Sequence, residues 1–202
     1  MISTALLMAS LFLAAPLHQV IAGPSDGAAV LLLHGAKYSS ADWESLGTVD
    51  LLAEKGYRVI ALDLPGYGRS GARRRLDPAT FLAEYLDEAG IESVTVVAPS
   101  MSGGFAFPLL AGHPQRLDGF VALAPVGAMN HLQGLRRADV PLLALWGAND
   151  PVVPLTEGRV LADMLAESEL VIIPGGRHAW YFEEGDRFHE LLLAFLEGLD
   201  SD

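Results

Sequence analysis

The sequence predicts an α/β protein built on one doubly wound, mostly parallel sheet flanked by helices. Short apolar runs rich in β-branched residues alternate along the chain with longer amphipathic stretches, the order of repeated βα units. These runs are continuously apolar rather than alternating in polarity, which indicates strands covered on both faces. With 202 residues, 51% of them hydrophobic and 19% charged, the chain suits a single domain with a buried core.

This pattern places six strands and five helices along the chain. The strands are expected at Val30–Leu33, Arg58–Leu62, Val94–Ala98, Phe120–Leu123, Leu142–Trp146 and Leu170–Ile173. The helices are expected near Trp43–Lys55, Pro78–Ala89, Met101–Ala111, Leu155–Ala166 and Glu184–Leu199. Gly56, Gly90 and Gly112 follow three of these helices, where a helix end favours a positive φ.

Charge and composition exclude several function classes. The formal net charge is −12, and so acidic a surface repels phosphate backbones, which predicts no nucleic-acid partner. There is no cysteine, so disulfides, thiolate metal sites and a cysteine nucleophile are excluded. No two histidines have metal-ligand spacing, and we expect neither a metal nor a cofactor. The oligomeric state stays open.

The N-terminus allows two interpretations. Residues 1–17 include an apolar, uncharged run from Ala5 to Leu17, and Val20-Ile21-Ala22 offers a small-residue cleavage site, as in a secretory leader. No lysine or arginine precedes the run, however, and a buried first strand is the alternative. We expect one domain over residues 18–202, exported or periplasmic if the leader is genuine and cytoplasmic otherwise.

Ser100 has the setting of a strained nucleophile turn. It lies between a predicted strand and a predicted helix, with the small residues Ala98 and Ser102 two positions to either side. Such a turn needs small neighbours because its backbone approaches adjacent elements closely, and it exposes the hydroxyl at the sheet edge. Locally, a serine N-cap is an equally good interpretation. Ser102 is the rival nucleophile, but it lies inside the start of the helix.

The first predicted strand leads into His34-Gly35-Ala36. The glycine permits a sharp turn, so the Ala36 N–H can face the serine and, with the Met101 N–H at its helix start, form a two-donor oxyanion hole. His34 could be a base, but its place at a strand end favours a buried hydrogen-bonding role.

Two later strand ends supply an acid and a base. Asp150 follows the strand Leu142–Trp146 and precedes a proline, and His178 lies on a glycine-rich loop before the last helix. Either alone is ordinary: a turn aspartate and a loop histidine are common. Together with Ser100 they occur in the order Ser, Asp, His, each after a separate strand, and this predicts a catalytic triad in which histidine activates serine.

Other polar residues are weaker candidates. Asp63, before Leu64-Pro65-Gly66-Tyr67-Gly68-Arg69-Ser70, is expected to shape its loop, and Asp63 or Asp118 would take the acid role only if Asp150 did not. The basic cluster Arg73-Arg74-Arg75 is either solvated or steers an anionic substrate.

From about residue 18 onwards, these motifs resemble an α/β-hydrolase. Leu31-Leu32-Leu33-His34-Gly35, the Asp63–Ser70 segment, and the Ser100, Asp150 and His178 loops all match that superfamily. Pro99-Ser100-Met101-Ser102-Gly103, the serines at 39 and 40, and Trp43 with Leu46-Gly47-Thr48 are similar to the small alpha/beta hydrolase domain-containing protein 14 subfamily. The resemblance implies a serine hydrolase of small acyl esters, with Ser100, Asp150 and His178 as triad, Ala36 and Met101 as oxyanion donors, and coenzyme A as an acyl acceptor in one branch. The apolar N-terminus departs from it.

The segment Pro125–Pro141 is too short for an independent helical cap. We therefore expect no lid domain and an open, shallow site that takes small acyl groups, or an acyl group presented on a larger surface. Two other functions stay open: cofactor-free perhydrolysis by the same triad, and a non-catalytic binding protein that retained the fold.

Overall fold

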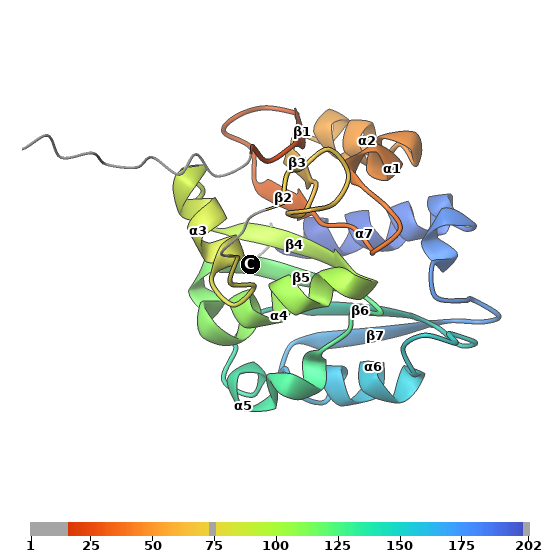
Figure 1. Ribbon diagram of the computed structural model, residues 1–202. Coiled ribbons are helices and arrows are strands. Elements are labelled where there is room, and N and C mark those ends of the chain that lie inside the picture. Colours follow the sequence, from red (N-terminus) through yellow and green to blue (C-terminus); the bar gives the residue numbers. More distant parts are fainter. Residues whose placement is uncertain (1–15, 73–75, 200–202) are drawn as a thin grey trace, which may run out of the picture.

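The computed structural model describes residues 16–72 and 76–199. In this part of the chain one seven-stranded sheet has the order β1-β3-β2-β4-β5-β6-β7 (Figure 1). Only β1 runs antiparallel, against β3, and every other pair is parallel. The strands are β1 Gln19–Ala22, β2 Ala29–Leu32, β3 Arg58–Leu62, β4 Val94–Pro99, β5 Leu117–Leu123, β6 Leu142–Gly147 and β7 Ser168–Ile173. The predicted fold class is confirmed, and each of the six expected strands is present.

Helices cover both faces of this sheet (Figure 1). The α-helices are α1 Ser40–Ser45, α2 Thr48–Glu54, α3 Phe81–Glu88, α4 Gly103–Gly112, α5 Leu132–Leu135, α6 Leu155–Ala162 and α7 Gly185–Leu199. Short 3-10 turns are η1 Ser100–Ser102, η2 Pro114–Arg116, η3 Ala128–Asn130 and η4 Trp180–Phe182.

The strands bury side chains into two separate cores. Leu31 and Leu33 face the core shared with α3, α4, α5 and α6, whereas Val30 and Leu32 face the core of α1, α2 and α7. Because neighbouring residues of a strand point to opposite faces, a strand covered on both sides must be apolar at every position. This explains the unbroken apolar runs.

Two helix expectations were wrong in detail. The predicted helix Trp43–Lys55 is two helices, because Gly47 adopts a φ of 79° between α1 and α2, and this left-handed residue ends the first helix. Gly56 and Gly90 have the expected positive φ, but Gly112 does not, since it is the last residue of α4 itself.

The strand β1 is not among the six expected strands, although a buried first strand was the alternative to a leader; β1 is instead a half-exposed strand. Val20, Ile21 and Ala22 pair with Ala61, Ile60 and Val59 of β3, so a cut after Ala22 would remove an edge strand. The Pro16 carbonyl also accepts a hydrogen bond from the Gly71 N–H. The expected apolar leader falls mainly on residues 1–15, which lie outside the described residues, and so do Arg73, Arg74 and Arg75. No described helix has both the length and the apolar character to cross a membrane.

Candidate active site

Ser100 lies in a strained turn between β4 and α4. Its φ is 51°, a left-handed value that residues other than glycine seldom adopt. Its carbonyl accepts a 2.9 Å hydrogen bond from the Val126 N–H, which anchors the turn to the loop after β5. The flanking Ala98 and Ser102 are fully buried. A larger side chain at either position would have no room, and small residues therefore suffice where glycine is usual.

Close packing also fixes the start of α4. The Ser102 hydroxyl donates a 2.7 Å hydrogen bond to the Pro99 carbonyl, so this rival serine is buried and already paired. A Cβ at Gly103 would lie 2.3 Å from the Val126 carbonyl oxygen, so only glycine fits there. The backbone thus holds Ser100 in place from both sides.

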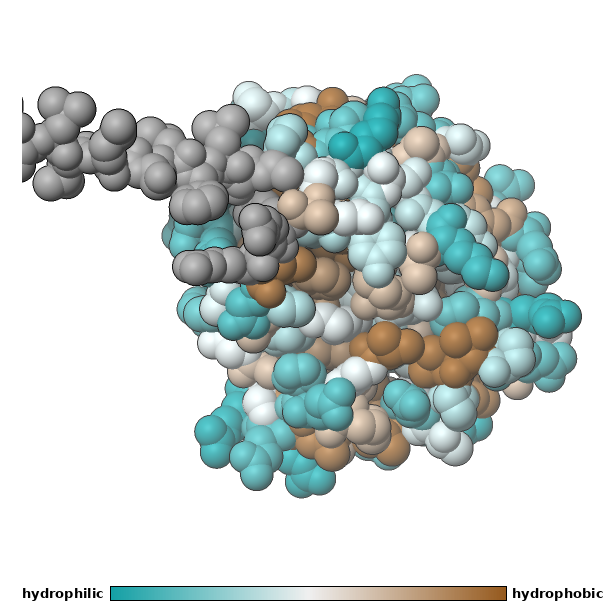
Figure 2. Space-filling model, in the orientation of Figure 1, coloured by the Kyte–Doolittle hydropathy of each residue, from teal (hydrophilic) through white to brown (hydrophobic). Residues whose placement is uncertain are grey.

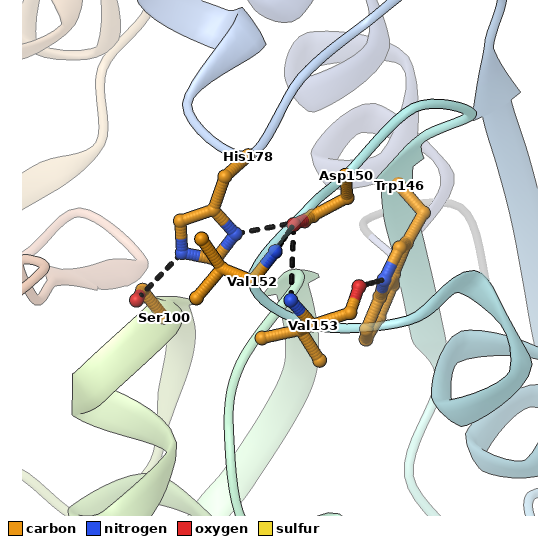
Figure 3. A network of polar contacts seen from close by, with 6 residues as sticks. All are labelled: Ser100, Trp146, Asp150, Val152, Val153 and His178. Atoms are coloured by element: carbon orange, nitrogen blue, oxygen red, sulfur yellow. Dashed lines mark hydrogen bonds and ion pairs between the residues drawn. The ribbon is translucent and has the colours of Figure 1, made fainter.

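The structure brings Ser100, His178 and Asp150 into one hydrogen-bonded chain (Figure 3). His178 Nε2 lies 2.7 Å from Ser100 Oγ, and His178 Nδ1 lies 2.7 Å from Asp150 Oδ2. The Asp150 side chain is fully buried, whereas 19% of the His178 side chain is exposed. With a carboxylate at Nδ1, that nitrogen carries the proton and Nε2 is free to accept one from serine.

Asp150 is itself held by backbone donors. Its Oδ1 accepts hydrogen bonds from the Val152 N–H at 2.7 Å and the Val153 N–H at 3.0 Å. The Trp146 indole N–H donates to the Val153 carbonyl at 3.0 Å, which ties this turn back to β6 (Figure 3). The carboxylate therefore presents its other oxygen, Oδ2, to His178.

The loops after β6 and β7 touch through a glycine. A Cβ at Gly147 would lie 2.4 Å from the Gly176 carbonyl oxygen and 2.5 Å from that of Arg177. The Asn149 N–H donates to the same Gly176 oxygen at 2.9 Å. This contact sets the distance between the Asp150 and His178 loops. Sequence reasoning missed it, although a glycine ending a buried strand is a signal of close approach.

His34 is buried and hydrogen-bonded at both ring nitrogens. Nε2 accepts the Leu64 N–H at 2.9 Å, so the ring proton lies on Nδ1, which donates to the Gly35 carbonyl at 2.9 Å. Burial lowers the pKa of His34 and keeps the ring neutral. Both ring nitrogens are thus used structurally, which leaves no base at this position.

The segment after β2 runs beside the serine. A Cβ at Gly35 would lie 3.6 Å from the Cβ of Ser100, and the Gly35 carbonyl also accepts the Tyr38 N–H at 3.0 Å. Because a trans peptide is planar, fixing this carbonyl directs the Ala36 N–H the opposite way. Ala36 is exposed at the surface. Met101 is the second residue of η1, where a helical N–H has no partner in its own helix.

The remaining acids lie apart from this chain of bonds. Asp63 follows β3 and is fully buried, and its carboxylate accepts the backbone N–H groups of Ser40 and Arg69. Asp118 is an exposed residue near the beginning of β5. It therefore lies at the amino ends of the parallel strands, whereas the triad lies at their carboxyl ends. Within residues 16–72 and 76–199, no group of three or more histidine, aspartate or glutamate side chains could hold a metal ion.

Comparisons with known proteins agree with this architecture. The family model described as alpha/beta hydrolase fold matches residues 28–140. The chain belongs to the α/β-hydrolase family. It is 35% identical over 189 residues to the rat (Rattus norvegicus) protein named "Putative protein-lysine deacylase ABHD14B", covering 88% of this chain and 89% of that one. It is also 37% identical to "Protein ABHD14A" of Danio rerio over 176 residues, 85% of this chain but only 65% of the relative.

Solved structures show the same fold. A "predicted CIB-like hydrolase" from Thermoplasma acidophilum superposes with a TM-score of 0.82 at 26% identity, covering 91% of this chain and 99% of the other. The esterase RhEst1 from Rhodococcus gives a TM-score of 0.78 at 21% identity, covering 90% and 94%. The family match, the rat relative and the Thermoplasma structure together support a hydrolase.

Proposed function

We propose that this α/β-hydrolase cleaves small acyl groups from esters through a covalent intermediate on Ser100, with His178 as base and Asp150 as the supporting acid. The observation that carries the proposal is the unbroken chain of 2.7 Å contacts from Ser100 through His178 to the fully buried side chain of Asp150. A serine hydroxyl is a weak nucleophile, and it becomes effective when an adjacent imidazole takes its proton.

The geometry supports a two-step reaction. His178 Nε2 takes the hydroxyl proton while Ser100 Oγ attacks the acyl carbon, and the resulting imidazolium gives that proton to the departing alkoxide. Water then loses a proton to His178 and attacks the acyl-enzyme, and Ser100 leaves with that proton as the acid is released. Asp150 stays ionised throughout and stabilises the imidazolium.

The Ala36 and Met101 backbone N–H groups are our candidates for the oxyanion hole. The Gly35 peptide is fixed beside Ser100, and Met101 directly follows the nucleophile at the start of a helix. Donors held in place before reaction stabilise the negative charge that develops on the substrate oxygen.

An apolar strip beside the triad supports a small acyl group as substrate. Val126, Met129 and Val152 are among the most exposed large apolar side chains, and they come from the loops after β5 and β6. Figure 2 shows apolar surface on the face between α4 and α6. The Pro125–Pro141 connection contains η3 and the four-residue α5, and α5 packs on α4 rather than over the serine. Nothing in that connection would enclose a long chain.

A second candidate substrate is an acyl group on a lysine of another protein. The open surface around the serine favours it, since a protein-borne acyl-lysine needs a site without a lid, and the rat relative is named for that reaction. Transfer to coenzyme A in place of water would use the same acyl-enzyme. Adding coenzyme A to a p-nitrophenyl acetate assay and measuring acetyl-coenzyme A tests that branch.

The deciding experiment compares Ser100→Ala with Ser102→Ala. We expect Ser100→Ala to lower kcat/KM for p-nitrophenyl acetate by at least about 10³-fold and to abolish labelling by a fluorophosphonate probe. Ser102→Ala should keep the label and most of the activity, because its hydroxyl is buried against Pro99. The reverse pattern would assign the nucleophile to Ser102, and an unlabelled wild type would indicate a non-catalytic binding protein.

A further inference from the structure

We propose that Asp63 is a positioning residue for the oxyanion hole, because its buried carboxylate holds the backbone segment 35–40 that carries the Ala36 N–H. The inference rests on the proposed function. It concerns a charged group that the reaction itself does not use and that is completely removed from solvent.

The carboxylate joins two segments that are distant in sequence. Its Oδ1 accepts the Ser40 N–H at 2.6 Å, and its Oδ2 accepts the Arg69 N–H at 2.7 Å. Ser40 is the first residue of α1 and lies four residues beyond Ala36. The α1 start is therefore fixed to the end of β3, and the segment 35–40 is held at its far end.

The same residue is fixed through its backbone. The Asp63 N–H donates to the His18 carbonyl at 3.0 Å, and the Asp63 carbonyl accepts the Ser70 hydroxyl at 2.6 Å. A Cβ at Gly68 would lie 2.2 Å from Oδ2, so the loop packs directly on the carboxylate. Because Asp63 is held rigidly, the backbone groups of Ser40 and Arg69 that bind its carboxylate are held in place too.

A second route leads from Asp63 to the same peptide. The next residue, Leu64, donates its N–H to His34, and His34 in turn holds the Gly35 carbonyl. Asp63 is thus connected to both ends of the segment 35–40. Its carboxylate binds the Ser40 N–H at one end, and its neighbour Leu64 holds Gly35 through His34 at the other. A displacement of Asp63 would therefore move the Ala36 N–H as well.

The buried negative charge of Asp63 depends on its hydrogen-bond donors. In the described part of the chain no lysine, arginine or histidine forms an ion pair with this carboxylate. Burial raises the pKa of Asp63, but hydrogen bonds from the Arg69 and Ser40 N–H groups outweigh burial and hold the pKa below its usual value. Two backbone donors therefore compensate the buried charge. An asparagine has only one acceptor oxygen, so one of these N–H groups would face an NH₂ group.

The test compares Asp63→Asn with Ser70→Ala. We expect Asp63→Asn to lower kcat/KM for p-nitrophenyl acetate by about 10- to 100-fold, less than the loss of a whole oxyanion donor. The inhibition constant of a trifluoromethyl ketone, which forms an oxyanion on the serine, should rise by a similar factor. Ser70→Ala removes a hydrogen bond to the same residue on the side away from Ala36, so it should lower the Tm without either kinetic effect.

Each outcome decides between the two roles. If Asp63→Asn lowers only the Tm and keeps kcat/KM and ketone binding at the Ser70→Ala level, Asp63 is merely structural and the inference is wrong. If Asp63→Asn does not fold, Ser40→Pro removes the N–H bound to Oδ1 at a first helical position that suits proline, after an extended Ser39. Ser40→Pro should show the same losses in kcat/KM and in ketone binding, and normal values of both would refute the inference. A Ser100→Ala enzyme that keeps its activity would instead refute the proposed function.

Discussion

Asp150 uses its two carboxylate oxygens for different purposes. Oδ1 accepts the N–H groups of Val152 and Val153, which fixes the turn, and Oδ2 faces His178 Nδ1. An asparagine in the same orientation would keep the first set of bonds, because its oxygen can take the place of Oδ1. Only the contact to the imidazole would change.

Asp150→Asn should therefore separate catalysis from folding. The new NH₂ group would face Nδ1, so the ring would take its proton on Nε2 and could not accept one from Ser100. We expect kcat for p-nitrophenyl acetate to fall by about 10³-fold or more, with a Tm close to that of the wild type. Steady-state kinetics and thermal unfolding measure the two quantities. Full activity would show that the Asp150 carboxylate does not orient His178.

Single residues were predictable where chemistry and chain order agree. Ser100, Asp150 and His178 follow β4, β6 and β7, and the carboxyl ends of parallel strands lie along the same edge of a sheet, so their meeting could be predicted without coordinates. The bonds of Asp63 to Ser40 and Arg69 could not, because they join segments far apart in sequence. From sequence only a loop-shaping role was evident.

At the scale of elements, two adjacent glycines at the start of α4 differ sharply. A Cβ at Gly103 would press on the Val126 carbonyl at 2.3 Å, whereas a Cβ at Gly104 would meet no atom within 4 Å. The two positions have nearly the same sequence context, so they form a matched pair. A difference in stability or activity between the alanine variants at these two positions therefore measures how tightly α4 packs against the loop after β5.

Gly103→Ala should displace the turn that carries Ser100, and Gly104→Ala should not. Because Val126 also donates to the Ser100 carbonyl, we expect Gly103→Ala to lower both the Tm and kcat/KM. Gly104→Ala replaces a glycine in a helix by alanine and should stabilise the fold by up to about 1 kcal/mol with normal activity. Thermal unfolding and p-nitrophenyl acetate kinetics provide the comparison. Equal Tm and kcat/KM values for the two variants would show that α4 can shift to accommodate a Cβ at position 103.

Element boundaries were harder to predict than element types. Gly47 breaks the helical pattern of 43–55, but a glycine within an amphipathic stretch does not reveal its φ. The strand β1 is only four residues long, and its apolar residues Val20, Ile21 and Ala22 closely follow another apolar run, so no alternation in the sequence distinguished it. Its pairing with β3 depends on the fold as a whole.

For the whole molecule, two half-buried or buried histidines couple folding to pH. Burial lowers the pKa of His34 and of His189, which shares a 2.9 Å hydrogen bond with Thr48, below the ordinary 6.5. As the pH falls through 6.5 the unfolded chain gains protons at these rings while the folded chain does not, so stability is lost on acidification.

We therefore expect the free energy of unfolding to be lower at pH 5.5 than at pH 7.5, with each ring contributing at most about 1.4 kcal/mol per pH unit. Urea unfolding at both pH values measures this difference. His189→Gln should reduce the dependence, since it removes one of the two groups. A free energy of unfolding that is constant across this range would contradict the coupling.

The Pro125–Pro141 connection holds only η3 and the short helix α5, and we expect this to limit the acyl chains that the proposed site accepts. A fully buried methylene contributes about 0.8 kcal/mol, close to fourfold in kcat/KM, and an enclosed site collects this gain repeatedly. Here Val152 is 59% exposed and Val126 37%, so the apolar strip can shield only the first few carbons. We expect longer chains to extend into water and to gain nothing further.

We expect kcat/KM for p-nitrophenyl acetate or butyrate to exceed that for the laurate, with no increase in activity at a lipid–water interface. Val152→Ser should lower the ratio of butyrate to acetate activity while leaving acetate nearly unchanged, because acetate has no methylene to place on the strip. A preference for acyl chains of ten or more carbons, measured below their micelle concentrations, would require a deep apolar pocket. Within residues 16–72 and 76–199, the four-residue α5 and the exposed Val126 and Val152 do not enclose such a pocket.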